Sequence, residues 1–483
     1  MRDSLRHKRT GALLAVTVLL GTGCTDGGDP SAESSSPPAT APASQASPTQ
    51  TAPAQTGSAP VTVQAVPGLD SAPFDQARQA VVPQGWTMSV WARTTRPRLA
   101  VWTPDDQLLV SVPAQGQVLR FTPGPEGPEE SVLLDGLQQP HGLEFAGSTL
   151  YVAESDQIVA FDYADAAATN PRVVAGGLPN AESPELRGAY AHALKSVAVG
   201  PDGAVYFSIG STGNITAEDR RADPPRATVM RVPPGGGPAE PFATGVRNGT
   251  GLAVAPDGTI WTANNGRDNV AFPEPGPQYG QVIPEYVDEN PPEQIARLTP
   301  GRELGWPYCN NTGGPADLPF IRDVQTNPDG AQLDCASLPP VEQSMGAHSA
   351  PLGLSFVDGA LPAPYAHGAL IGVHGSWNRQ PPRPPEVSFY SWQDGELGDQ
   401  QTFVGGFQYV DGSRWGRPVA AVAGPDAARR LIDAAHLAER IVGRELTGQI
   451  LHIHAPMGPG AAENIRLTGR YGGNFSFFHF LSQ

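Results

Sequence analysis

The chain has 483 residues, a formal net charge of −17 and 39% hydrophobic residues, with 56 glycines and 52 prolines. It carries no basic stripe, so the composition excludes a nucleic-acid-binding protein. Its length also exceeds a single domain of ordinary size, unless that domain is built from repeats.

Residues 1–24 are predicted to be an export signal of the lipoprotein type. Four basic residues precede an apolar core at 13–20, which is too short to cross a bilayer as a helix. Cys24 follows small residues and would carry the lipid; an ordinary secretory signal with an unmodified Cys24 is the alternative. We therefore expect an extracytoplasmic protein that is anchored to the membrane only through this lipid, or that is secreted.

Residues 25–66 consist of Ser, Pro, Ala, Thr and Gln with almost no large apolar residue. Such a segment cannot bury enough apolar surface to offset the entropy of ordering it. We expect a disordered tether between the signal and the folded part.

Residues 67–426 are predicted to form an all-β protein, a β-propeller of six blades. An apolar strand, a Pro-Asp-Gly or related turn and a second apolar strand recur at 99–112, 142–155, 196–210 and 251–266. Glycine accepts the positive φ that a tight hairpin needs. A period of roughly 40–55 residues with several strands in each unit is typical of a propeller. The alternatives are a β-sandwich or two smaller β-domains.

The two ends of the propeller carry separate predictions. The strand at 85–92 is predicted to complete the last blade and close the ring. After Asp426 the repeat stops, and 427–449 has apolar residues at helical spacing. We interpret 427–483 as an atypical tail that results from a frameshift near Asp426, which would leave the last blade incomplete. A genuine added helix is the alternative.

Seven motifs in order resemble those of the soluble PQQ-dependent aldose sugar dehydrogenases, the glucose/sorbosone dehydrogenase family, where PQQ is pyrroloquinoline quinone. They are GLQQPHGLEF, HALKSVAVGPDG, GVRNGTGLAVAPDG, LGWPYCN, AHSAPLG, HGSWNR and GSRWGRPVA, within residues 85–426. The resemblance implies oxidation of aldoses or sorbosone-like aldehydes to lactones or acids, with PQQ and calcium as cofactors and an unidentified electron acceptor.

The resemblance also assigns the catalytic groups. His192 would be the base that removes the proton of the sugar hydroxyl, a role that suits an imidazole. Arg247 would polarise the quinone oxygen, and Asn248 would bond the cofactor ring. The family's glucose enzyme has an Asp before this histidine, whereas this chain has Ala191, so another group must orient the ring.

Cofactor carboxylates and calcium need further groups. Backbone carbonyls at Gly266 and Arg267 match the family's calcium ligands, and calcium accepts carbonyl oxygens. Arg379, Arg414 and Arg417 fall where the family places cations that bind the carboxylates of PQQ. A guanidinium suits that task because its planar fork pairs with a carboxylate.

Gln139, His141, His348 and Trp377 could line the sugar site, with simple packing or turn bonding as the alternative. Trp306 could stack on a sugar or pack between blades. Cys309 and Cys335 are expected to form a disulfide after export, with two free thiols as the alternative.

Two other functions stay open on the sequence alone. A non-catalytic, carbohydrate-binding propeller agrees with Ala191 and with the altered tail. A metal-dependent lactonase on a similar propeller would need Glu, Asn and Asp side chains around an axial calcium.

Overall fold

The computed structural model describes residues 57–313, 319–424, 428–433 and 447–455. The chain divides into two units, 1–53 and 54–483, and every described residue belongs to the second. The predictions for the signal, for Cys24 and for residues 25–56 therefore lie outside the described residues. No helix of the described part is both long enough and apolar enough to cross a membrane.

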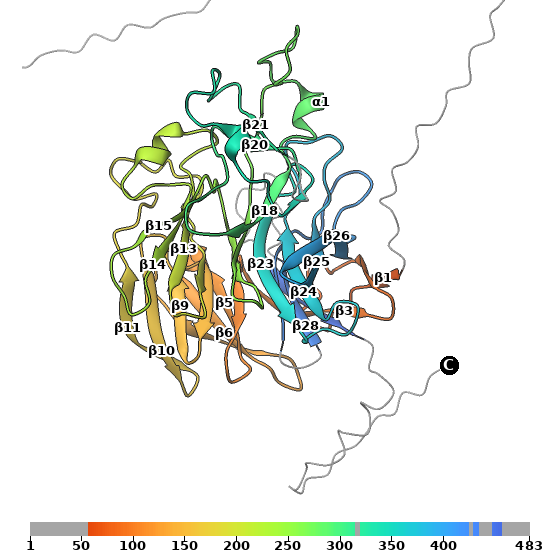
Figure 1. The fold of residues 1–483 in the computed structure, drawn as a ribbon. Helices are drawn as coiled ribbons and strands as arrows, with labels where there is room; N and C mark the ends of the chain where they lie inside the picture. Colours follow the sequence, from red (N-terminus) through yellow and green to blue (C-terminus); the bar gives the residue numbers. More distant parts are fainter. Residues whose placement is uncertain (1–56, 314–318, 425–427, 434–446, 456–483) are drawn as a thin grey trace, which may run out of the picture. The chain divides into compact units, whose positions relative to one another are not determined.

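The first three blades follow the chain as antiparallel sheets (Figure 1). The first consists of β4 (Ala100–Trp102), β5 (Leu108–Val112), β6 (Gln117–Thr122) and β7 (Glu129–Leu134). The second consists of β8 (Gly142–Ala146), β9 (Thr149–Ala153), β10 (Ile158–Ala164) and β11 (Ala167–Ala175). The third consists of β12 (Val197–Val199), β13 (Val205–Ile209), β14 (Thr228–Val232) and β15 (Glu240–Thr244), with β19 (Arg302–Glu303) added in parallel.

The remaining three blades have four strands each. One consists of β16 (Gly251–Val254), β17 (Ile260–Asn264), β18 (Glu293–Leu298) and β22 (Gln343–Met345). The next consists of β23 (Pro351–Asp358), β24 (His367–Val373), β25 (Glu386–Gln393) and β26 (Glu396–Val404). The last consists of β27 (Pro418–Ala423), β28 (Ala428–Asp433), β29 (Thr447–His454) and β3 (Thr87–Thr95).

The innermost strands make a closed ring. Contacts run in the order β4, β8, β12, β16, β23 and β27, and β27 also contacts β4. The repeat predicted six blades. In the described residues five sheets are regular four-stranded blades, and the sheet built on β12–β15 departs from the repeat because β19 joins it as a fifth strand.

The last blade combines both ends of the fold. β3 pairs with β29 in antiparallel register, as the strand predicted at 85–92 required. The prediction of a helix in 427–449 is wrong for the described part, because 428–433 and 447–449 belong to β28 and β29. The last blade therefore has four strands, and the propeller continues past Asp426; residues 456–483 lie outside the described part.

The described end of the segment predicted to be disordered is instead ordered. β1 (Ser58–Thr62) pairs with β2 (Gln79–Pro83), although 58–62 falls within the segment expected to be disordered. Val63 follows β1 and is buried in a cluster with Trp86, Phe403 and Phe407. Apolar contacts with the last two blades thus order the end of this segment.

Apolar residues from adjacent sheets form the core between blades. Leu108, Val110 and Val112 of β5 pack with Ala420 of β27 and Ile450 of β29. The strands alternate with tight turns; Gly203 has φ +82° beside Asp202, whose carboxylate accepts the N–H of Ala204. This turn residue and the apolar strands around it produce the repeating hairpin.

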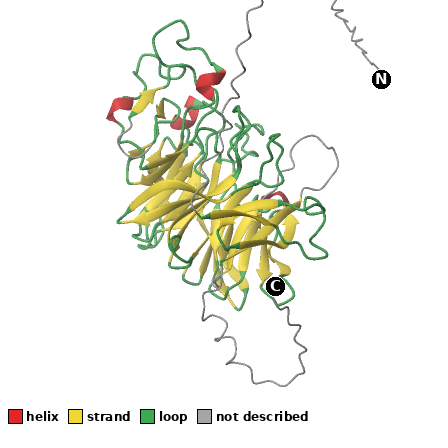
Figure 2. Ribbon diagram, turned by 90° about the vertical axis from the view of Figure 1, so that its right-hand side faces the viewer, coloured by secondary structure: helices red, strands yellow, loops and turns green. Residues whose placement is uncertain are grey.

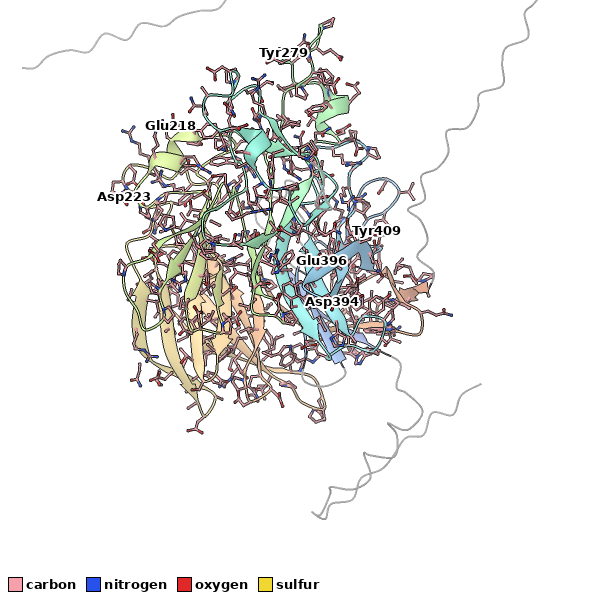
Figure 3. All side chains as sticks on the ribbon, in the orientation of Figure 1. Glu218, Asp223, Tyr279, Asp394, Glu396 and Tyr409 are labelled. Carbon is pink, nitrogen blue, oxygen red and sulfur yellow. A yellow bond between two sulfur atoms is a disulfide. The ribbon has the colours of Figure 1, made fainter. Side chains whose placement is uncertain are left out.

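Short elements lie in the loops at one end of the blades (Figures 1 and 2). They are α1 (Pro284–Val287), β20 (Cys309–Asn311), β21 (Phe320–Arg322) and the 3-10 helices at Pro113–Gln115, Ala217–Arg221 and Cys335–Ser337. Cys309 and Cys335 form a disulfide in this region. Tyr279 lies in these loops, whereas Asp394 and Glu396 flank the turn between β25 and β26 (Figure 3).

Candidate active site

A pocket of about 150 Å³ lies where several innermost strands begin. Its lining comes from segments that precede β12, β16 and β23, from the start of β18 and from the loops after β17 and β24, which the ring brings together. The lining residues are His192, Arg247, Asn248, Asn265, Gly266, Asp268, Glu293, His348, Ala350 and Trp377. Six residues that the sequence singled out thus converge, and Arg267 and the remaining candidates lie elsewhere.

The His192 ring has one defined tautomer. Its Nδ1 lies 2.9 Å from the main-chain oxygen of Ser211 and 2.9 Å from its Oγ. The Ser211 hydroxyl donates to the Gly213 carbonyl at 2.7 Å, so both Ser211 oxygens can only accept from the ring. Nδ1 therefore carries the proton, and Nε2 keeps a free electron pair. Ser211 supplies the orienting contact that Ala191 cannot give.

Burial, together with the charge of Arg247, lowers the pKa of His192 to about 3. The imidazole is therefore neutral over the physiological range and able to accept a proton. Gly210 permits its placement, because a Cβ at that position would lie 2.6 Å from the Cβ of His192. The strand β13 can approach the His192 segment only with glycine there.

Arg247 is buried and held by carbonyl oxygens. Its Nη1 donates to the Gly266 carbonyl at 2.7 Å, and its Nη2 donates to Asn214 Oδ1 at 3.1 Å. A carboxylate oxygen of Asp268 lies 3.7 Å from Nη2. The neighbouring Asn248 is fixed by its backbone, whose N–H donates to Asn264 Oδ1 at 2.9 Å. These contacts fix a positive charge at the pocket wall.

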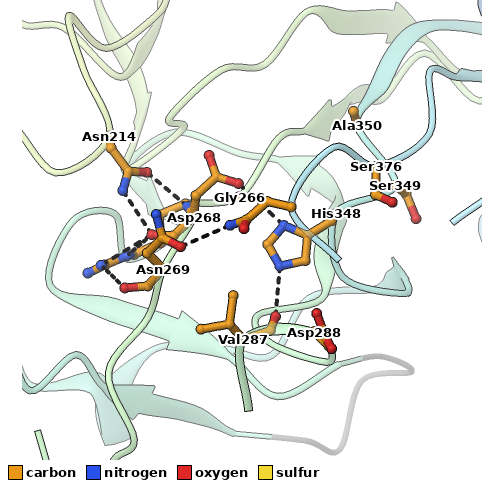
Figure 4. A network of polar contacts seen from close by, with 12 residues as sticks. Asn214, Gly266, Asp268, Asn269, Val287, Asp288, His348, Ser349, Ala350 and Ser376 are labelled. Carbon is orange, nitrogen blue, oxygen red and sulfur yellow. Dashed lines mark hydrogen bonds and ion pairs between the residues drawn. The ribbon is translucent and has the colours of Figure 1, made fainter. Parts of the chain in front are cut away.

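His348 contributes a second positive charge (Figure 4). Its Nε2 lies 2.7 Å from the Val287 carbonyl and its Nδ1 lies 3.3 Å from Asp268 Oδ1. Both partners are acceptors, so both ring nitrogens must carry protons. Burial alone would lower the pKa of His348, but the contacts with Asp268 and Val287 outweigh burial and raise it.

Glu293 ties two loops of the site together. Its carboxylate accepts the Gly266 N–H at 2.5 Å and the Ala350 N–H at 3.2 Å. Burial raises the pKa of this carboxyl, whereas the two backbone N–H groups act in the opposite direction. Glu293 thus sets the spacing between the loop after β17 and the start of β23.

The predicted calcium ligands differ from each other in their surroundings. The Gly266 carbonyl accepts from the Arg247 guanidinium, so its oxygen faces a cation. The Arg267 side chain points to a different partner: its Nη1 lies 2.5 Å from Asp323 Oδ2, and both side chains are buried. Because a guanidinium already occupies one of the two predicted carbonyls, the pair does not fit a calcium ion.

The three arginines predicted to bind cofactor carboxylates have other partners. Arg379 pairs with Glu289 at 2.6 Å. Arg414 donates to the carbonyl of Ser376 at 2.6 Å, and Arg417 donates to that of His374 at 2.8 Å. Arg414 and Arg417 therefore hold the 374–376 backbone, which precedes Trp377, instead of lining the pocket of His192.

The predicted sugar-binding residues separate into three environments. His348 and Trp377 line the pocket of His192, and the Trp377 side chain is 74% exposed at its rim. His141 is buried and bonds the Lys195 carbonyl through Nδ1 at 3.1 Å; burial lowers its pKa to about 3. Gln139 lines a different pocket with Arg98. His141 therefore lies buried away from the pocket of His192.

Four polar residues of the site were missed by the sequence analysis: Asn214, Ser211, Asp268 and Glu293. Asp268 lies in the run Asn-Asn-Gly-Arg-Asp-Asn that follows β17, next to the predicted calcium carbonyls, and this clustering was an available signal. The other three gave no local signal. Trp306, whose role was left open, is buried and donates its ring N–H to the Asn214 carbonyl at 2.8 Å.

No group of three or more His, Cys, Asp or Glu side chains that could hold a metal occurs in the described part of the chain.

Comparison with known proteins agrees with this architecture. A PQQ-dependent pyranose dehydrogenase of Coprinopsis cinerea is 25% identical over 285 residues, which are 52% of this chain but only 36% of that protein. An uncharacterized protein of Borreliella burgdorferi is 24% identical over 312 residues, 59% of this chain and 70% of that protein.

Solved structures share the fold at low identity. The PQQ domain of the Coprinopsis cinerea pyranose dehydrogenase in its holo form has a TM-score of 0.63 at 20% identity, covering 78% of this chain and 97% of that domain. A calcium structure of a Trichoderma reesei carbohydrate-active enzyme of family AA12 has a TM-score of 0.60 at 18% identity, covering 78% and 96%. The TrAA12-like family model matches residues 80–403, so the chain belongs to the TrAA12-like family.

Proposed function

We propose that this protein oxidises aldose sugars to lactones outside the cytoplasm, with PQQ as the oxidant. Membership of the TrAA12-like family supports this proposal. The observation that carries it is the tautomer of His192, whose Nδ1–H is held by Ser211 so that Nε2 can act as a base beside Arg247.

The donor set of the pocket fits a cofactor with several carboxylates. Arg247 and the imidazolium of His348 are positive, and Asn248 also lines the pocket. The carboxylates of Asp268 and Glu293 line it too, but His348 and backbone N–H groups already engage them. PQQ, when bound, supplies the quinone that accepts a hydride from the sugar.

The chain's own residues would handle the proton and the orientation of the sugar. Nε2 of His192 accepts the proton of the C1 hydroxyl, and the Ser211 carbonyl stabilises the resulting imidazolium through Nδ1–H. Asp268 favours the charged ring through its negative charge. The exposed face of Trp377 offers a stacking surface for the apolar side of the sugar.

The test uses the purified full chain with added PQQ and calcium, and follows the reduction of a dye by a panel of aldoses. We expect sugar-dependent dye reduction that requires PQQ. His192→Gln should lower kcat by roughly 10²–10⁴-fold while PQQ still binds, because a general base contributes about that much. His367→Gln changes an exposed histidine that pairs with Asp358 and serves as the matched control.

The outcome against this proposal is equally specific. If native protein binds PQQ but no aldose reduces the dye, the dehydrogenase assignment is wrong. If the protein does not bind PQQ, the non-catalytic propeller replaces it, and lactone hydrolysis without PQQ would favour the lactonase.

A further inference from the structure

A second pocket, of about 340 Å³, lies on the other side of the segment that carries His192. It is lined by Arg96, Arg98, Pro113, Ala114, Gln139, Ala181, Tyr190, Ala191, Ala193 and Leu194. Ala191 and Ala193 flank His192 in sequence, whereas His192 itself lines the candidate active site. The two pockets therefore share one backbone segment as a wall.

Two arginine side chains in this pocket have no partner. Neither Arg96 nor Arg98 makes a side-chain hydrogen bond or an ion pair with any residue that the structure describes. By contrast, Arg247 and Arg267 each have carbonyl or carboxylate partners. Arg96 is exposed and Arg98 is half-buried.

The placement of Arg98 is unfavourable without a counterion. Burial lowers the pKa of Arg98, and the like charge of Arg96 acts in the same direction. Removing a charge from water without a partner costs free energy, which an arriving anion would recover. The chain as a whole is acidic, with a net charge of −17, so two unpaired arginines at one pocket contrast with its overall charge.

The rest of the lining suits a sugar. Gln139 adds an exposed amide, and the alanine and proline side chains leave space around it. Tyr190 fixes the shared wall, because its hydroxyl donates to the Gly210 carbonyl at 2.9 Å. A guanidinium pair with a neighbouring amide matches a carboxylate next to hydroxyl groups.

We infer that the pocket of Arg96 and Arg98 binds the carboxylate of an acidic sugar, a uronate, beside the site of the proposed oxidation. This inference rests on the proposed function for the oxidation step.

The test compares D-galacturonate with D-galactose, which differ at C6 by a carboxylate against a hydroxymethyl group. Calorimetry on the full chain without PQQ measures binding, so the result does not depend on dehydrogenase activity. We expect galacturonate to bind more tightly than galactose. Arg98→Gln should weaken galacturonate binding by roughly 10- to 100-fold, the usual contribution of a charge-assisted hydrogen bond, and leave galactose unchanged.

Two further variants exclude trivial explanations. Arg98→Lys keeps the charge but loses the fork and should give an intermediate affinity. Arg297→Gln removes the same charge from an exposed position on β18 and should have no effect. Circular dichroism and thermal unfolding would establish that each variant is folded before its binding is compared.

Three results would overturn the inference. Equal binding of galacturonate and galactose by the native chain would show that the pocket does not select a carboxylate. Equal losses in Arg98→Gln and Arg297→Gln would show a general charge effect. If Arg98→Gln weakens PQQ binding and leaves galacturonate binding unchanged, the pocket serves the cofactor. A native chain that binds galacturonate but oxidises no sugar would instead contradict only the proposed function.

Discussion

The Nδ1–H of His192 donates to the main-chain carbonyl of Ser211 at 2.9 Å, and the Ser211 hydroxyl accepts from the same atom. A main-chain carbonyl cannot be removed by substitution, so the tautomer is built into the backbone of the loop after β13. Ser211 thus orients the ring at a site where residue 191, which precedes the histidine, is an alanine.

Ser211→Ala should therefore have a modest effect on the reaction. The variant loses the Oγ contact but keeps the carbonyl contact, so the ring stays in the same tautomer. We expect kcat to fall by roughly 3- to 10-fold, which corresponds to about 1 kcal/mol for one hydrogen bond. Steady-state kinetics with dye reduction measures this, and a loss as large as that of His192→Gln would contradict the assigned role of the carbonyl.

His348 should make stability depend on pH. Its pKa is raised in the folded protein, so its contribution is complete below the unfolded value of about 6.5 and is lost as pH rises through the folded pKa. The difference in Tm between the native chain and His348→Gln should shrink as the pH rises above about 6.5. The groups that face the ring are Asp268, Glu293 and the Val287 carbonyl. As a control, His367→Gln should leave the dependence of Tm on pH as it is in the native chain.

The pair of Arg267 and Asp323 should be necessary for stability. Both side chains are 2% exposed, and Arg267→Met would leave Asp323 buried without its cation. Breaking a buried pair by removing one partner typically costs about 3–5 kcal/mol. Urea unfolding measures the free energy of unfolding, and Arg267→Lys should lie between the native chain and Arg267→Met. Arg297→Met, at an exposed position, is the control. If Arg267→Met is as stable as Arg297→Met, water reaches Asp323 and the pair is not needed.

The disulfide should stabilise the loops at the site end of the propeller. Cys309 and Cys335 are 26 residues apart and both are buried in the cluster that contains Tyr308 and Phe320. Replacing both with serine should lower the free energy of unfolding by about 2–4 kcal/mol. Thermal unfolding of the double variant should match that of the native chain under reducing conditions.

Cys24→Ala tests the proposed anchor. If Cys24 is lipidated, the native chain should be found with the membrane fraction, and the variant should be released in soluble form. Fractionation with metabolic labelling by a fatty acid measures both properties. Labelling of the variant at the native level would contradict lipidation at this residue.

The sequence predicted the all-β architecture, the ring closure by β3 and the convergence of His192, Arg247, Asn248, His348 and Trp377. These predictions succeed because turn spacing and strand order place the beginnings of the innermost strands at one end of the ring. The sequence did not show which groups the long arginine side chains contact. Arg414 and Arg417 hold carbonyls of a neighbouring loop, which no local pattern encodes.

The tail shows a different limit of sequence analysis. Helical spacing after Asp426 suggested a helix, yet β28 and β29 occupy part of that segment because the edge left by β27 and β3 pairs with it. Tertiary pairing overrode local periodicity. The same holds for β1, which the composition of 25–66 did not indicate.

Pairing of β3 with β29 also constrains the order of events when the protein is made. β3 is synthesised early, but its partner ends at His454, so the last sheet cannot form until nearly the whole chain has left the ribosome. Contacts this distant in sequence form slowly. The ring therefore closes only late in folding, after the rest of each blade has had time to form.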